Sequence, residues 1–450
     1  MIPINPREIA AEAFMQIMTE GAYNHMALRR VLKQNGAMSV QNRAFVTEIV
    51  NGTLRNLYLI DYHINAVSKT KIEKMKPWIL AVLRTAVYQI LFLDVPDHAA
   101  CDEAVKLAGI RGYRALSKFV NGVLRTIIRT KQEIVLPQEG TAEYLHILYS
   151  HPLWLVKMWI AYYGYAQTEL LCKANNDAPD VTIRVNTQRI QEKDLIQKLE
   201  DVGVVVTKGN LWDNALHLRH TADLRKLDLF TEGYFHVQDE SSQTAAAVVA
   251  PQKGERILDL CAAPGGKSFT MAELMEDTGE MVSCDIYPQK VIQIQEGAAR
   301  LGLQSIQAKE RDACKAVETE FMYYDRVLAD VPCSGLGLLR KKPDIRLKKD
   351  GSEIDALVPI QKEILMQAAK YVKPGGVLVY STCTLCRKEN EKNIEWFLQQ
   401  HTDFVLDDFS DLVTSELKEQ AKTGMLTLFP HQHHTDGFFI ARFRKKGGQD

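Results

Sequence analysis

The sequence predicts an α/β protein with three parts: a helical region, a small α+β module and a doubly wound, mostly parallel sheet. Three observations support this prediction. Apolar residues recur at helical spacing, without strand patterns, through the first ~130 residues. A strand, a helix and a strand then follow, and from about Gly233 short apolar strands alternate with helices. Such alternation is typical of a parallel sheet with helices on both faces.

The first part is expected to be a compact helical bundle. Asn5 followed by Pro6 has the signature of a helix N-cap and a first-turn proline. Apolar residues then follow at helical spacing from Ile9 to Ile17. Further helical patterns cover residues 43–59, 78–93, 101–107 and 116–128.

The second part follows a linker at residues 131–140, which contain Pro137 and Gly140. An amphipathic helix is expected over 152–171, then a strand over 181–187, a helix over 193–203 and a strand over 204–209. The predicted domains are 1–135, 145–228 and 229–450.

The third part contains the candidate site. Strands are expected at 256–260, 280–285, 326–331 and 377–382. In doubly wound sheets, ligands bind outside the carboxyl ends of the strands. The motifs described below all follow strands of this set.

Composition and charge exclude several classes. No apolar run approaches the ~20 residues of a membrane helix, and the N-terminus lacks the layout of a secretion signal. Eight cysteines in 450 residues are too few for a disulfide scaffold. We therefore expect a cytoplasmic protein without a membrane partner. Residues 1–130 hold 17 Lys and Arg against 10 Asp and Glu, which suits a polyanionic partner or simply solvated helix faces.

The turn CAAPGGK at residues 261–267 is a candidate ligand loop. Gly265 and Gly266 allow close approach of a ligand, and the following helix offers free N–H groups. A dinucleotide site needs G-x-G-x-x-G, which is absent, and a P-loop needs glycine where Cys261 stands. S-adenosylmethionine remains as a common ligand of this geometry, with its amino-acid end in the loop.

Two aspartates at later strand ends fit a nucleoside. Asp285 stands 20 residues after Gly265, the spacing at which an acid meets ribose hydroxyls. Asp312 lies where a third strand should stop, and its carboxylate would accept from an adenine amino group. Each aspartate alone is also typical of a turn or cap. Their order favours a nucleoside cofactor, with NAD still open on these residues.

Two cysteines also follow strands, Cys333 in ADVPCSGLG and Cys383 in YSTCTLCRKE. Cytosine C5 is a poor nucleophile towards a methyl sulfonium, but a thiolate that adds to C6 makes C5 enamine-like. This reaction needs a nucleophilic cysteine, an acid near N3 and a group that assists release. Cys383, Asp330 and Cys333 are residues of these types, and strand-end position makes either cysteine eligible as the nucleophile.

Other interpretations of the cysteines remain. Strand-end cysteines are often simply buried thiols. Cys383-x-x-Cys386 has metal-ligand spacing, and the histidines of 431–434 could contribute, but a second CxxC pair is absent and we predict no metal. A thioredoxin-like redox pair is disfavoured because this CxxC follows a late strand.

At these motifs the sequence resembles the RsmB/Sun family of bacterial 16S ribosomal RNA (cytosine-5) methyltransferases. Asp-x-Pro-Cys at 330–333 and Ser-Thr-Cys at 381–383 are similar to the family's two cysteine motifs, and LDLCAAPGGK to its cofactor loop. The resemblance implies that Cys383 is the nucleophile and that Cys333 helps to release the product. It also implies that Asp330 lies between cofactor and target base.

The resemblance implies S-adenosylmethionine as cofactor, with Asp285 as the ribose ligand and Asp312 as the adenine-side ligand. Seven residues would line the methionine end: Cys261, Ala262, Ala263, Pro264, Gly265, Gly266 and Lys267.

The resemblance covers nearly the whole chain. Residues 42–55 and 101–127 look like the family's NusB-like helical RNA-binding domain. The basic loop at 340–349 would suit phosphate contacts near a flipped-out base, or is a solvated loop. Cys386 departs from the family pattern and introduces the alternative of a disulfide with Cys383.

The sequence thus predicts a monomeric enzyme that methylates C5 of a specific cytosine in small-subunit ribosomal RNA, either naked or in an assembling subunit. A tRNA cytosine-5 methyltransferase would use the same cysteines. A non-catalytic ribosome assembly factor that binds RNA would keep only the fold. Loss of a catalytic cysteine or a loop glycine would favour that last alternative, and all of them are present.

Overall fold

The structure, a computed structural model, describes residues 5–219, 221 and 223–447. The outer ends of the first and third predicted domains, 1–4 and 448–450, lie outside these residues. The chain forms two compact units, residues 1–177 with 339–351 and residues 178–338 with 352–450. The predicted linking module is divided between them: its residues up to 177 belong to the first unit, and its strands and the helix over 192–201 belong to the second.

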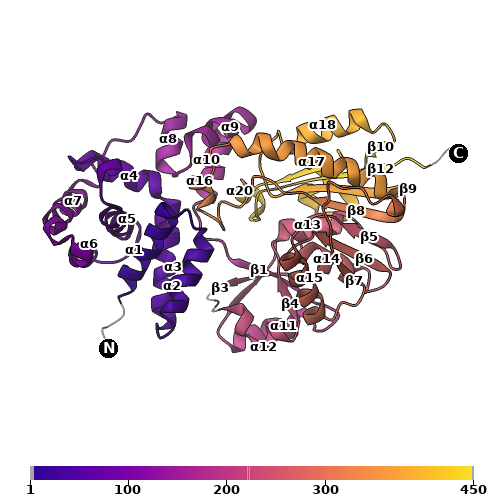
Figure 1. The fold of residues 1–450 in the computed structure, drawn as a ribbon, viewed down its shortest axis with the longest axis horizontal. Helices are drawn as coiled ribbons and strands as arrows, with labels where there is room; N and C mark the ends of the chain where they lie inside the picture. Colours follow the sequence, from indigo (N-terminus) through magenta and orange to yellow (C-terminus); the bar gives the residue numbers. More distant parts are fainter. Residues whose placement is uncertain (1–4, 220, 222, 448–450) are drawn as a thin grey trace. The chain divides into compact units, whose positions relative to one another are not determined.

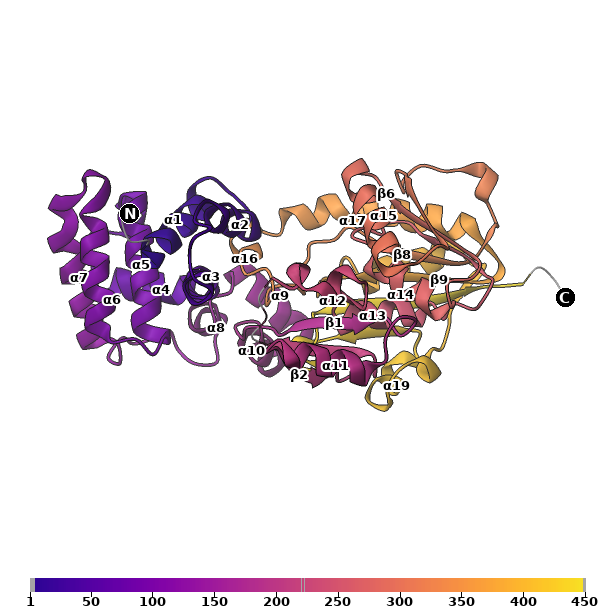
Figure 2. The ribbon, with the colours of Figure 1, turned by 90° about the horizontal axis from the view of Figure 1, so that it is seen from below.

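The first unit is built around α5 (Pro77–Phe92), which is buried along most of its length. Helices α5, α6 (Asp97–Ala108) and α7 (Ser117–Thr130) lie side by side (Figure 2). Asn5 caps α1 as predicted, because its side chain accepts a hydrogen bond from the N–H of Arg7 at 3.0 Å. The helices before residue 131 are α1 (Pro6–Thr19), α2 (Asn24–Gln34), α3 (Val40–Arg55), α4 (Leu57–Val67), α5, α6 and α7.

Each of two ranges predicted as helical contains two separate helices. The pattern over 43–59 spans α3 and α4, because the backbone leaves the helical region at Asn56. The pattern over 152–171 spans α9 (Leu153–Tyr163) and α10 (Tyr165–Ala174), which are separated by Gly164 at φ +79°. Apolar spacing continues across both breaks, so periodicity alone does not reveal them. Helix α8 (Ala142–Leu148) precedes this pair.

Residues 339–351, with α16 (Ile345–Lys348), complete the first unit. Arg346 is fully buried there. Its guanidinium donates to the carbonyl oxygens of Arg55 at 2.9 Å, Ser150 at 3.2 Å and Asn175 at 2.7 Å. Burial lowers the pKa of Arg346 to about 9.

These contacts correct part of the interpretation of the basic loop. Lys348 also donates to two backbone carbonyl oxygens, at 3.1 and 2.6 Å, and its ammonium lies 4.0 Å from the ring centroid of Tyr23. The side chains of Arg346 and Lys348 therefore bind the helical unit rather than stand in solvent. A count of charges along the sequence does not distinguish these two situations.

The second unit begins with a small antiparallel sheet of order β2-β3-β1-β4. It contains the predicted strand, helix and strand, together with two further strands. The elements are β1 (Val181–Val185), α11 (Glu192–Asp201), β2 (Val205–Lys208), β3 (Ala215–Arg219), α12 (Asp228–Thr231) and β4 (Phe235–Val237).

The larger sheet has eight strands in the order β10-β12-β9-β8-β5-β6-β7, with β11 beside β12. Strands β5 to β9 are parallel, and β10, β11 and β12 form antiparallel pairs. The sheet is therefore mostly parallel, as predicted. Its strands are β5 (Arg256–Asp259), β6 (Glu280–Asp285), β7 (Ile306–Glu310), β8 (Tyr324–Asp330), β9 (Val372–Thr382), β10 (Phe404–Leu406), β11 (Met425–Leu428) and β12 (Phe438–Lys445).

Helices cover both faces of this sheet (Figure 1). Alternate residues of β8 divide between two cores. Val327 and Ala329 pack with α17 (Ser352–Tyr371) and α18 (Glu391–Gln400), whereas Leu328 packs with α13 (Glu240–Val248) and α14 (Gly266–Leu274). The helices are α13, α14, α15 (Pro288–Leu301), α17, α18, α19 (Lys418–Ala421) and α20 (Pro430–His433). Within the described ranges, no helix has the length and apolar character needed to cross a bilayer.

Candidate active site

The turn between β5 and α14 has the shape of a ligand-binding loop. Gly265 has φ +109°, and a Cβ atom there would lie 2.3 Å from the ring of Phe269, so only glycine fits without a shift. A Cβ atom at Gly266 would meet nothing closer than 3.6 Å, so a ligand can approach this backbone. The remaining predicted loop residues are Cys261, Ala262, Ala263, Pro264 and Lys267.

A carboxylate absent from the predicted site lies directly before this loop. Asp259 ends β5, is fully buried and accepts from Ser268 Oγ at 2.8 Å. Burial raises the pKa of Asp259 to about 7. Its Oδ1 atom is buried without a hydrogen-bond partner. A ligand with N–H or ammonium donors would satisfy such an acceptor. The signal in the sequence was an acid at the end of an apolar strand.

The two predicted nucleoside ligands lie at the carboxyl ends of neighbouring parallel strands. Asp285 ends β6, accepts from the N–H of Tyr287 at 3.1 Å and lies 3.4 Å from the ammonium of Lys290. Asp312 follows β7 and accepts from the N–H of Cys314 at 3.0 Å. These local bonds fit the turn interpretation of each aspartate as well as the ligand interpretation.

Lys267 and Asp330 form an ion pair at the same edge. Lys267 Nζ donates to Asp330 Oδ2 at 2.7 Å, and Ser381 Oγ donates to Asp330 Oδ1 at 2.7 Å. Burial opposes the charge of Lys267, but the nearby anions, Asp330 first among them, outweigh it and raise its pKa. The ammonium therefore stays protonated beside the carboxylate. The sequence placed Lys267 in the cofactor loop but did not show this partner.

The two candidate catalytic cysteines are in contact. Cys333 Sγ lies 3.2 Å from Cys383 Sγ, because β8 and β9 are parallel neighbours and each cysteine follows one of them. The N–H of Gly337 donates to the carbonyl of Cys383 at 3.0 Å, which holds the two loops together. The hydrogen bond to Cys383, burial and the negative charges of Cys383 and Glu389 raise the pKa of Cys333 well above its ordinary value.

Two further cysteines of this unit, Cys386 and Cys261, also have raised pKa values. Cys386 is fully buried, and burial raises its pKa to about 11. Cys383 and Cys386 are both free, so the disulfide considered from the sequence is not formed. Burial and the carboxylates of Asp259 and Asp330 raise the pKa of Cys261.

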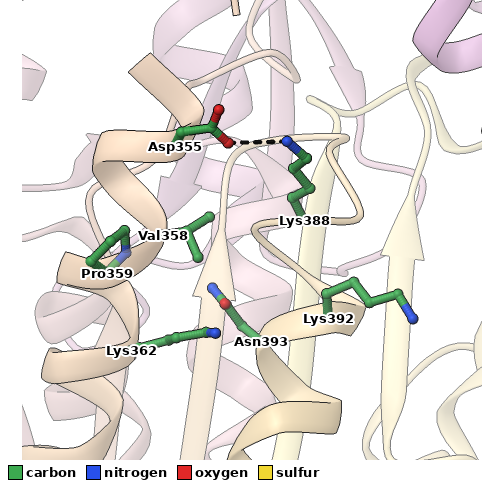
Figure 3. A pocket seen from close by; sticks show the side chains of 7 residues that line it. All are labelled: Asp355, Val358, Pro359, Lys362, Lys388, Lys392 and Asn393. Carbon is green, nitrogen blue, oxygen red and sulfur yellow. Dashed lines mark hydrogen bonds and ion pairs between the residues drawn. The ribbon is translucent and has the colours of Figure 1, made fainter. Parts of the chain in front are cut away.

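A pocket of about 260 Å³ lies between α17 and α18 (Figure 3). Three lysines line it, Lys362, Lys388 and Lys392. Lys388 pairs with Asp355 at 3.0 Å, but both side chains are more than half exposed, so this pair is weak. The ammonium of Lys362 lies 4.7 Å from the ring centroid of Trp396.

The loop, the acids and the paired thiols all lie at the carboxyl edge of the sheet, where doubly wound folds bind nucleotides. The second unit is accordingly a Rossmann-like S-adenosylmethionine-dependent methyltransferase domain with the small α+β module before it, and the helical unit is NusB-like. Family models match three stretches of the chain. They describe the NusB family over 4–129, a ferredoxin-like domain of RsmF/B methyltransferases over 151–225, and the 16S rRNA methyltransferase RsmB/F over 246–444.

Relatives match along the whole length. A Bacillus subtilis (strain 168) protein described as a probable ribosomal RNA small subunit methyltransferase B is 41% identical, over 98% of this chain and 99% of its own. A Synechocystis relative with the same description is 37% identical, over 98% of this chain and 100% of its own. The solved structure of PH0851 is 29% identical, with a TM-score of 0.82 over 99% of this chain and 100% of its own. The chain belongs to the RsmB/F family of 16S rRNA methyltransferases, as the motifs indicated.

Proposed function

We propose that this protein transfers a methyl group from S-adenosylmethionine to C5 of a specific cytosine in 16S ribosomal RNA, through a covalent bond between Cys383 and C6. The pair of thiols 3.2 Å apart, Cys333 and Cys383, is the observation that carries the proposal. C5 and C6 are adjacent ring atoms, and the reaction needs a nucleophile at one and assistance with release at the other. Two thiols in contact suit both needs.

Cys383 is the nucleophile of this proposal. The family resemblance assigns this role to Cys383, and the Lys267 ammonium interacts electrostatically with it. Cys333 has a raised pKa, so it keeps its proton more readily. The Cys383 thiolate bonds to C6, and C5 then takes the methyl group. Water then accepts the C5 proton, the C5–C6 double bond re-forms, and the S–C6 bond breaks. The Cys333 thiol, 3.2 Å from Cys383 Sγ, donates to the departing Cys383 thiolate and so assists release.

Residues 261–267 are proposed to line the methionine end of the cofactor, with Asp285 at the ribose and Asp312 at the adenine. The open backbone at Gly266 and the unsatisfied Oδ1 of Asp259 fit a ligand that carries donor groups. When bound, S-adenosylmethionine supplies a methyl group on a positively charged sulfur. The neighbouring carboxylates favour that charge.

Asp330 is proposed to contact the N3 edge of the cytosine. Addition of a thiolate at C6 places negative charge on the ring, and a proton donor near N3 stabilises it. The hydrogen bond from Lys267 Nζ to Asp330 Oδ2 supports this role, because it keeps a proton beside the carboxylate.

RNA is the proposed partner of both units. We propose that the NusB-like domain, residues 1–135, and the linking module, 145–228, position small-subunit ribosomal RNA for the methyltransferase domain, 229–450. The excess of basic residues in 1–130 supports this role. The three lysines of the pocket are candidates for phosphate contacts. We propose a cytoplasmic monomer that acts on naked RNA or on an assembling subunit.

Bisulfite sequencing of ribosomal and transfer RNA from a strain that lacks the protein tests the proposal. We expect one cytosine of 16S ribosomal RNA to lose its methyl group and to regain it when the gene is restored. Loss in a tRNA instead would favour the tRNA enzyme. If every methylcytosine persisted in both pools, the protein would be a non-catalytic factor.

A further inference from the structure

Glu389 is a fully buried carboxylate between β9 and α18. Four uncharged groups donate to it. The N–H of Ser334 donates to Oε1 at 2.8 Å, and Ser334 Oγ donates to Oε2. Gln361 Nε2 donates to Oε1 at 2.9 Å and Thr384 Oγ1 to Oε2 at 3.3 Å. Burial of a charged carboxylate is costly, so these bonds offset a large desolvation penalty.

The donors come from both cysteine loops. Ser334 follows Cys333 in the chain, and Thr384 follows Cys383. Their hydroxyl oxygens also lie 2.7 Å from each other. A single carboxylate thus joins the loop after β8 to the loop after β9, through the residues that follow the two cysteines.

Further hydrogen bonds, from Gln361 and Asn393, hold Glu389 and the two loops in place. Gln361 of α17 donates to the carbonyl of Pro332 at 3.0 Å, as well as to Glu389. Asn393 of α18, which also lines the pocket of Figure 3, donates to Gln361 Oε1 at 2.9 Å and to the carbonyl of Glu389 at 3.1 Å. Gln361 of α17 therefore holds the carboxylate of Glu389, and Asn393 of α18 holds both Gln361 and the backbone of Glu389.

We infer that Glu389 is a positioning residue that sets the spacing of the Cys333 and Cys383 loops, so that both thiols reach one base. The inference rests on the proposed function, in which the two thiols act on adjacent ring atoms. A site of this kind needs its reacting groups held within about 0.5 Å by supporting hydrogen bonds. The charge of Glu389 also contributes to the raised pKa of Cys333, after the hydrogen bond to Cys383, burial and the charge of Cys383.

Kinetics of the full-length Glu389→Ala and Glu389→Gln variants test this role. The substrates are S-adenosylmethionine and small-subunit ribosomal RNA purified from a strain that lacks the protein. We expect Glu389→Ala to lower kcat at least about 30-fold, with KM for RNA and Kd for S-adenosylmethionine within twofold of the wild type. Glu389→Gln should recover at least about tenfold, because its amide oxygen still accepts from Ser334 and Gln361.

Glu240 provides a matched control, because it is a buried carboxylate of the same unit that also accepts several hydrogen bonds. It accepts from the N–H groups of Asn210, Leu211 and Trp212 at 3.0, 2.6 and 3.1 Å. Glu240→Gln should leave kcat unchanged. An equal loss of kcat in Glu240→Gln, or a loss in Glu389→Ala that lies entirely in KM, would overturn the inference.

Oxidation by diamide gives a readout without RNA. Cys333 and Cys383 each lose one proton and one electron to form a disulfide, and diamide takes up the two protons and two electrons. Peptide mass spectrometry follows the rate of this crosslink. We expect it to be at least about fivefold slower in Glu389→Ala and unchanged in Glu240→Gln.

Thr384→Val serves the same purpose if Glu389→Ala does not fold, since it removes one donor and keeps the carboxylate. It should also slow the crosslink. An unchanged crosslinking rate in the folded variants contradicts the inference even where methylation is lost. If the wild type methylates no cytosine but the crosslink slows as expected, the proposed function fails and the positioning of the thiols stands.

Discussion

Two cations with little exposed side chain, Lys267 in the second unit and Arg346 in the first, are stabilised in different ways. Lys267 pairs with the carboxylate of Asp330 at 2.7 Å, and its pKa is raised although burial opposes its charge. Arg346 donates to carbonyl and amide oxygens, and burial lowers its pKa to about 9. Neutral oxygens fix backbone segments in place, whereas the ion pair holds a charged group at the carboxyl edge of the sheet. The contacts of Arg346 therefore suit a structural role, and the ion pair of Lys267 suits a role in the reaction.

Replacement of Lys267 should have the largest effect on activity. Lys267→Met removes the donor to Asp330 and the cation beside Cys383. We expect kcat to fall at least about 100-fold, the scale of general acid–base assistance, with little change in melting temperature. Single-turnover methylation of ribosomal RNA measures the rate.

Lys373→Met is the matched control. Lys373 of β9 pairs with Asp325 of β8 at 2.7 Å, near the amino end of the strand whose carboxyl end is Asp330. Its replacement should leave kcat within about twofold. An equal loss of kcat in the two variants would mean that the Lys267–Asp330 pair stabilises the sheet and has no specific role in the reaction.

Replacement of Arg346 should have the largest effect on stability. Arg346→Met leaves the buried carbonyl oxygens of Arg55, Ser150 and Asn175 without this donor. Unsatisfied buried groups cost about 1–3 kcal/mol each, so we expect a loss of about 3 kcal/mol or more in local stability. Amide hydrogen exchange in α9 and α10 reports it. Arg129 is an exposed residue of the same unit, so Arg129→Met should change the exchange rates little. An equal increase in exchange in this control would contradict a specific stabilising role for Arg346.

Ionisation of Asp259 should make the stability of the second unit depend on pH. Its pKa is about 7 in the folded protein and 3.8 as an ordinary carboxyl, so the folded state binds a proton that the unfolded state releases between these values. Protonation therefore stabilises the fold. This contribution is fully present below pH ~4 and is lost as pH rises through ~7.

Asp259→Asn cannot ionise, although its amide oxygen can still accept from Ser268. Between pH 5 and pH 8 the wild type should lose about 2 kcal/mol more stability than this variant, measured by urea unfolding. Parallel stability curves for the two proteins would show that the carboxyl does not titrate in this range.

The pocket lysines should have the smallest effect. Lys362→Gln or Lys392→Gln should raise KM for RNA about threefold and leave kcat unchanged. If each lysine contacts one phosphate, the slope of log affinity against log salt should fall by about 0.7–0.9 per variant. Lys422→Gln, an exposed lysine paired with Glu419, is the control, and an equal slope change there would remove the case for phosphate contacts.

The sequence predicted the parts of the fold that depend on local patterns. The strand spacing, the glycines at 265 and 266 and the two cysteine motifs could be recognised because each is short and continuous. Family resemblance, rather than spacing, separated the roles of Cys383 and Cys333. The strands β10 to β12 were not predicted, and Gly164 interrupts a helix whose apolar pattern continues on both sides.

The remaining features depend on contacts between distant residues. Lys267 and Asp330 are 63 positions apart, and Ser334 and Glu389 are 55 apart. Arg346 contacts Arg55 across 291 positions, which is why a basic loop in the sequence contains a buried arginine. No periodicity or motif encodes these partners, since each depends on how separate elements pack.

Trapping of the covalent enzyme–RNA adduct tests the central claim most directly. The wild type, Cys333→Ala and Cys383→Ala are incubated with ribosomal RNA and S-adenosylmethionine, and protein-linked RNA is resolved by denaturing electrophoresis. We expect the adduct to accumulate in Cys333→Ala, where release is impaired, and to be absent in Cys383→Ala, where the nucleophile is lost. An adduct in Cys383→Ala, with none in Cys333→Ala, would contradict it.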